Sequence, residues 1–145
     1  MVAVTDNRRS RWPRDLKAFA FFAALWAGVL TARLVLRDVV YYAETPLHAI
    51  LFGMRFEGLA ARVVLAAKAM TGFSIAIGIA TDKEWGIWLA LAYLVEVIAS
   101  DVIFMTAYMD SIAQASEVRV AGYLGMSAVL LLLYLWIRAR DLLSE

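Results

Sequence analysis

The stretch YLVEVIASDVIF, residues 93–104, lies inside a longer apolar run and yet carries Glu96 and Asp101. The whole run, about 85–108, is long enough to cross the ~30 Å hydrocarbon core of a bilayer as a helix rising 1.5 Å per residue. A carboxylate inside a membrane span is costly and is normally turned toward protein or water. The stretch therefore predicts a transmembrane helix with two polar contacts to other parts of the molecule.

The composition of the whole chain agrees with a membrane protein. Of its 145 residues 63% are hydrophobic, against about 45–50% in soluble domains. There are no cysteines, which excludes disulfides, thiolate metal sites and thiol nucleophiles. The net charge of +1 gives no field that would attract nucleic acid. We expect a single domain over residues 1–145.

Four runs are long enough to span a bilayer, and they cover about 18–36, 59–80, 85–108 and 118–137. The last three are joined by short links, which force neighbouring helices to run antiparallel. The sequence therefore predicts an all-α membrane protein, with four transmembrane helices in an up-down-up-down bundle.

The connection after the first span is too long for a simple turn. Thr45 is suited to cap a helix and Pro46 to begin one. Apolar residues then recur at helical spacing, at Leu47, Ile50, Leu51 and Met54. The pattern predicts a short interfacial helix over about 46–56 on the outer side.

Basic residues predict the orientation of the chain, because they are enriched in cytoplasmic segments. The sequence before the first span contains NRRSRWPR, and Arg138 and Arg140 follow the last one. We expect both termini in the cytoplasm, with the protein in the cell inner membrane.

Five charged residues fall within the predicted spans: Arg33, Arg62, Lys68, Glu96 and Asp101. Left unpaired they would cost on the order of 12–17 kcal/mol, so they must pair or face water. Counting along the helices at ~1.5 Å per residue places Lys68 and Glu96 at similar mid-membrane depth. Asp101 is shallower and points ~140° away from Glu96. We expect a Lys68–Glu96 pair, and Asp101 paired with Arg62, Arg33 or both.

Small residues mark the surfaces where helices approach closely in membranes. They recur at steps of four in the first span, and further candidates lie in the second and fourth. The predicted packing residues are Ala20, Ala24, Gly28, Ala32, Gly72, Ala76, Ala121 and Gly125.

These patterns favour a non-catalytic structural or accessory subunit, working with other membrane subunits or as a homo-oligomer in the lipid bilayer. The alternative is a proton- or cation-coupled small-solute transporter or channel that uses the five intramembrane charges. No nucleotide-binding or hydrolase motif occurs, and His48 is the only histidine. We expect no enzyme activity, no cofactor and no metal site.

Overall fold

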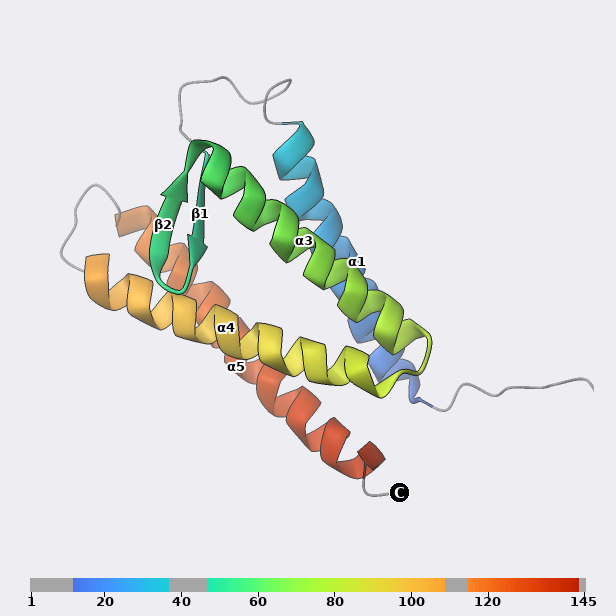
Figure 1. Ribbon diagram of the computed structural model, residues 1–145. Coiled ribbons are helices and arrows are strands. Elements are labelled where there is room, and N and C mark those ends of the chain that lie inside the picture. The colour runs from blue at the N-terminus through green and yellow to red at the C-terminus, as the bar shows by residue number, and fades with distance from the viewer. Residues whose placement is uncertain (1–11, 37–46, 109–114, 144–145) are drawn as a thin grey trace, which may run out of the picture.

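The computed structural model describes residues 12–36, 47–108 and 115–143. Over these residues the chain forms four long helices and one two-stranded hairpin (Figure 1). In chain order the elements are α1 (Arg14–Val35), β1 (His48–Leu51), β2 (Met54–Glu57), α3 (Gly58–Ala80), α4 (Glu84–Tyr108) and α5 (Ala115–Leu143).

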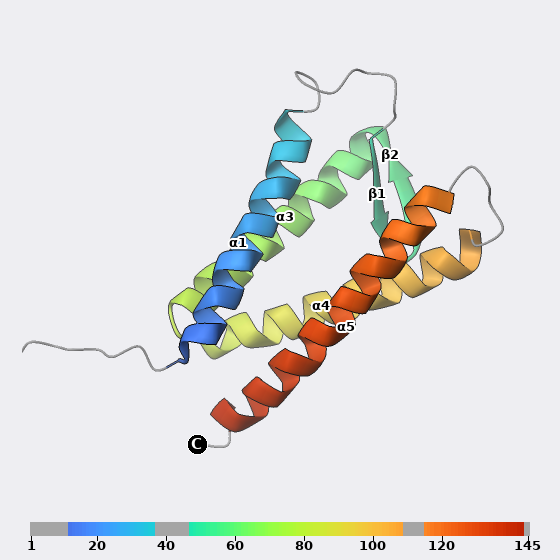
Figure 2. The ribbon, with the colours of Figure 1, turned by 180° about the vertical axis from the view of Figure 1, so that it is seen from behind.

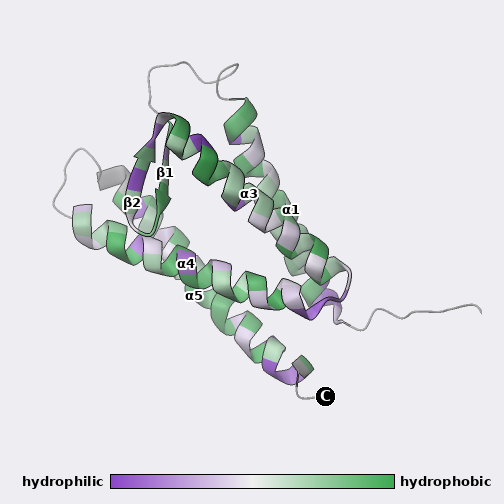
Figure 3. Cartoon of the chain, viewed as in Figure 1, coloured by the Kyte–Doolittle hydropathy of each residue, from purple (hydrophilic) through white to green (hydrophobic). Residues whose placement is uncertain are grey.

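All four helices are long and apolar enough to cross a membrane, as in an integral membrane protein. The shortest of them, α1, has 22 residues, or ~33 Å of helix. Figure 3 shows hydrophobic residues along most of the four helices. Hydrophilic residues gather on the hairpin, in the turn between α3 and α4 and at the end of α5. The predicted spans are therefore confirmed as membrane-length helices.

The turn between α3 and α4 brings two glycines into backbone contact. A Cβ atom added at Gly78 would lie 2.7 Å from the Cα of Gly86, and one added at Gly86 would lie 2.6 Å from the carbonyl carbon of Gly78. No side chain fits between backbones at that distance. The missing side chains let α3 and α4 cross tightly next to the turn, and both helices diverge from this point (Figure 1).

The helices pack as two pairs, α1 with α3 and α4 with α5. Successive helices run in opposite directions, and the two pairs spread apart away from the α3–α4 turn, as the views from both sides show (Figures 1 and 2). One cluster of fully buried side chains, with Leu16, Ile79, Ile87 and Leu135, joins all four helices. We call the end of the molecule where α1 starts and α5 finishes the terminal end. The four helices do not form a bundle closed along its whole length.

The predicted interfacial helix over 46–56 is wrong, because this segment forms the β-hairpin. Strands β1 and β2 pair antiparallel from His48 opposite Glu57 to Leu51 opposite Met54. The two residues between them, Phe52 and Gly53, have φ values of 49° and 73°. Positive φ at both positions is the conformation of the two-residue turn that best matches strand twist. Three helical turns are only marginally stable alone, and the glycine in the middle favours the turn.

The hairpin lies between α3 and α4, and both of its strands contact both helices. Leu47 and Ala49 are buried in a cluster with Leu30 of α1 and Leu65 of α3. The turn reaches α4 at Ser100, which is ~12 Å from the end of that helix at 1.5 Å per residue. Non-helical backbone is tolerated at such depth only where protein or a water-filled cavity surrounds it. We therefore call residues 48–57 the re-entrant hairpin.

Candidate functional site

The centre of the molecule contains an ion pair between α3 and α4. Lys68 Nζ lies 3.3 Å from Glu96 Oε2, and the two side chains are only 18% and 16% exposed. Both residues are near the middle of their helices. This is the pair that depth and rotation predict from the sequence. In a medium with little water, the attraction between the two charges offsets part of the free energy that each loses by leaving water.

The re-entrant hairpin extends this pair into a longer polar chain. Ser100 Oγ donates a hydrogen bond of 3.0 Å to Glu96 Oε1. The backbone N–H of Gly53 in turn donates to Ser100 Oγ at 3.2 Å, and this bond is buried. Each oxygen of Glu96 thus has one partner, Ser100 or Lys68. We call these four residues, Gly53, Ser100, Glu96 and Lys68, the buried polar chain.

Gly53 is required at the tip of the hairpin for two reasons. Its φ of 73° is a conformation that other residues rarely adopt. A Cβ atom here would also lie 2.1 Å from Cγ2 of Ile103 on α4. The sequence places a glycine in this segment, but nothing in the pattern shows that its N–H reaches Ser100, because that contact joins residues 47 positions apart. Serines inside a span commonly bond back to their own helix, and the sequence alone favours that reading for Ser100.

Asp101 does not pair with Arg62 or Arg33, so this part of the prediction is wrong. Its side chain is only 7% exposed and lies against α5, where a Cβ atom added at Gly125 would be 3.5 Å from Oδ2. Oδ2 is buried and makes no hydrogen bond within the described part of the chain. The ~140° rotation between Glu96 and Asp101 explains the difference, because it turns Glu96 to α3 and Asp101 to α5.

Arg33 and Arg62 lie outside the buried polar chain. Both residues are exposed, in the last turn of α1 and the first turns of α3, respectively. Neither one is an ion-pair partner of Glu96, whose pair within the described residues is with Lys68. A cation at the C-terminus of a helix is favoured by the helix dipole, and this is sufficient to explain why an arginine stands at position 33. The five predicted charges therefore do not form one network.

Most of the predicted packing residues are inside the fold. Those that are buried are Ala20, Gly72, Ala76, Ala121 and Gly125. Gly72 packs against α1, because a Cβ atom added there would lie 2.9 Å from the Cβ of Ala27. Ala24 and Gly28 are partly exposed and Ala32 is exposed. A Cβ atom added at Gly28 would meet nothing within 4 Å, so this part of α1 is not used for packing within the described chain.

A second polar cluster connects α1 and α5 at the terminal end. Arg138 forms an ion pair with Asp15, and Tyr134 Oη donates to Asp15 Oδ2 at 2.8 Å. These contacts join the first turn of α1 to the last turns of α5. From the sequence, the charges near the termini indicate only the orientation of the chain. No sequence spacing could have revealed the pairing, because the partners are more than a hundred residues apart.

Within the described ranges, no group of three or more His, Asp or Glu side chains is close enough together to hold a metal ion. No protein-family model, no characterised protein and no solved structure matches the chain. The site offers a salt-bridged carboxylate near the middle of a membrane-length helix, a hairpin linked to it through Ser100 and a second buried carboxylate beside α5.

Proposed function

We propose that the protein is a non-catalytic structural or accessory subunit of a membrane complex or homo-oligomer, which acts through helix packing. It sits in the cell inner membrane with both termini in the cytoplasm. The observation that carries this proposal is the open face of α1. There the predicted ladder of small residues continues past the contacts with α3, and Gly28 has free space beside it.

Small residues on a membrane helix have little to gain from lipid, whereas they allow another helix to approach its backbone closely. Ala24, Gly28 and Ala32 are at steps of four on one side of α1. In the same helix, Ala20 and Ala27 already serve the contacts within the chain. We define Ala24, Gly28 and Ala32 as the open α1 face, and we expect a helix of a second copy or of another subunit to pack on it.

Gly28→Leu tests this proposal with little risk to the fold, since a Cβ atom at this position meets nothing within 4 Å. The full-length protein should be extracted in mild detergent and its particle mass measured. The wild type should exceed the 16.1 kDa of one chain, through further copies or a co-purifying partner, and Gly28→Leu should shift it to the monomer. Ala67→Leu, on an exposed position of α3, is the control. A monomeric wild type without partner contradicts the proposal.

A second candidate function is proton- or cation-coupled transport, and the observation in its favour is Asp101. A buried carboxylate oxygen without a hydrogen bond is costly, and ionisable groups inside membranes commonly mark ion routes. Lys68, Glu96 and Asp101 would be the working groups, with Arg62 and Arg33 closer to the helix ends. Ion flux into proteoliposomes should then be present in the wild type and lost in Glu96→Gln. Equal flux in both proteins, or none in either, excludes this candidate.

A further inference from the structure

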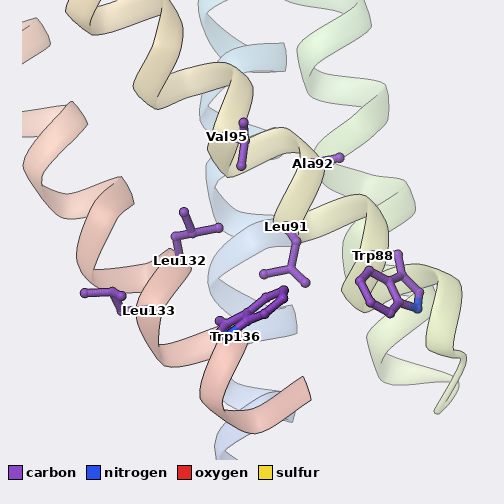
Figure 4. Close-up of a pocket in the computed structure, with 7 residues that line it drawn as sticks. All are labelled: Trp88, Leu91, Ala92, Val95, Leu132, Leu133 and Trp136. Atoms are coloured by element: carbon purple, nitrogen blue, oxygen red, sulfur yellow. The ribbon is translucent and has the colours of Figure 1, made fainter. Parts of the chain in front are cut away.

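An apolar groove runs between α4 and α5 on the outside of the molecule, next to the terminal end (Figure 4). Its volume is about 350 Å³, within the 300–1,000 Å³ typical of small-molecule sites. In Figure 4, Trp136 extends from α5 toward Leu91 of α4, and Trp88 lies beside the groove on α4. Leu91, Ala92 and Val95 line the α4 side, and Leu132, Leu133 and Trp136 the α5 side.

The length and position of the groove fit one acyl chain of the adjacent lipid leaflet. From Trp88 to Val95 the α4 wall rises ~10 Å, starting four residues from the beginning of the helix. Tryptophans prefer the level of the lipid headgroups, and the groove has one on each of its two helices. The walls are apolar from that level toward the membrane centre, as an acyl chain requires.

A charged residue follows the groove one helical turn further along α5. Arg140 follows Trp136 by four residues, so both are on the same stripe of α5. Its side chain is exposed, and it forms no ion pair with another described residue, whereas Arg138 is paired with Asp15. Glu84 occupies the corresponding stripe of α4, four residues before Trp88. A mouth with one charge of each sign has little preference for net headgroup charge, which leaves the phosphate as the common ligand for Arg140.

We infer that the groove binds one bilayer phospholipid, with an acyl chain between α4 and α5 and the phosphate at Arg140. The occupant is a lipid of the surrounding membrane. This inference does not depend on the proposed subunit function, because the groove and the open α1 face are on different helices.

Native mass spectrometry of the full-length protein tests the inference with two lipids that have the same acyl chains. One is phosphatidylethanolamine and the other is diacylglycerol, which lacks the phosphate. The wild type should retain the phospholipid about tenfold better, because one hydrogen bond from arginine to a charged phosphate contributes about 1.5 kcal/mol. Arg140→Gln should remove this preference. Arg33→Gln, which removes an exposed charge from α1, should leave it unchanged.

Filling the groove with Ala92→Phe should lower the retention of both lipids. Equal retention of phospholipid and diacylglycerol by the wild type would overturn the inference, as would an unchanged preference in Arg140→Gln. If Ala92→Phe reduces the particle mass by a whole subunit and leaves the lipid count unchanged, the groove holds a helix of another chain and the inference is wrong.

Discussion

Replacing the two members of the central ion pair by leucine, singly and together, should give strongly non-additive losses of stability. Lys68→Leu removes the partner of Glu96 Oε2 and leaves the carboxylate with the hydroxyl of Ser100 alone. Glu96→Leu leaves the Lys68 ammonium at mid-membrane without its carboxylate. Removing one member of a buried pair typically costs about 3–5 kcal/mol.

We place the expected loss at the lower end of that range. Both side chains are largely buried, with exposed fractions of 18% for Lys68 and 16% for Glu96, but snorkelling and local water defects lower the cost of a charge that has lost its partner inside a membrane. We expect each single variant to lose about 3 kcal/mol of unfolding free energy. The double variant strands no charge, and its Ser100 hydroxyl can bond back to its own helix. It should therefore recover at least about 2 kcal/mol relative to additive losses.

Titration of detergent-solubilised protein with a denaturing detergent, followed by tryptophan fluorescence, measures these differences. Arg33→Gln is the matched control, because it removes a charge that has no ion pair within the described residues. Its small effect should simply add to that of Lys68→Leu. If the losses of Lys68→Leu and Glu96→Leu also add, the two side chains are not partners and the packing of α3 against α4 is incorrect.

Three further substitutions, with Gly28→Ala as a control, test the local surroundings of single residues. Gly53→Ala places a Cβ atom 2.1 Å from an isoleucine side chain of α4 and should cost about 2–3 kcal/mol; an unchanged unfolding midpoint would show that the hairpin is not seated on α4. Gly86→Ala brings a Cβ atom against the backbone of Gly78 and should cost about 1–3 kcal/mol, whereas Gly28→Ala, in open space, should be tolerated in the same titration. Asp101→Asn keeps the shape of the side chain and removes a charge whose Oδ2 has no hydrogen bond, so thermal unfolding at neutral pH should show a gain of about 1–2 kcal/mol; a loss would reveal a partner of the carboxylate.

The membrane helices can be predicted from the sequence because apolar length alone determines them. The predicted span 59–80 corresponds to α3 (Gly58–Ala80), and 85–108 to α4 (Glu84–Tyr108). Two helices extend further than predicted, α1 back to Arg14 and α5 on to Leu143. Their polar ends carry no hydropathy signal, yet their backbones continue the helical hydrogen bonds beyond the apolar run.

The site could be predicted only in part. The Lys68–Glu96 pair follows from depth and rotation along two neighbouring helices, which a sequence does encode. The hairpin could not be predicted in this way, because the apolar residues of its segment also match a helical spacing. Whether the segment forms a hairpin or a helix depends on the turn at Gly53 and on contacts with α4. The pairing of Asp101 with Arg62 or Arg33 is predicted wrongly, since the sequence shows that Asp101 faces away from Glu96 but not that α5 lies there.

If another helix packs on the open α1 face, a single introduced cysteine should detect it directly, because the chain has no cysteine of its own. A single cysteine introduced as Gly28→Cys should form a disulfide-linked dimer in native membranes upon oxidation where the neighbour is a second copy of this chain, and a benzophenone maleimide attached to the same thiol should cross-link a different partner subunit upon illumination. Ala67→Cys, on an exposed position of α3, should give neither product. Efficient cross-linking at position 28 alone is the result that we predict. No product at position 28, or equal products at both positions, would contradict the proposed packing.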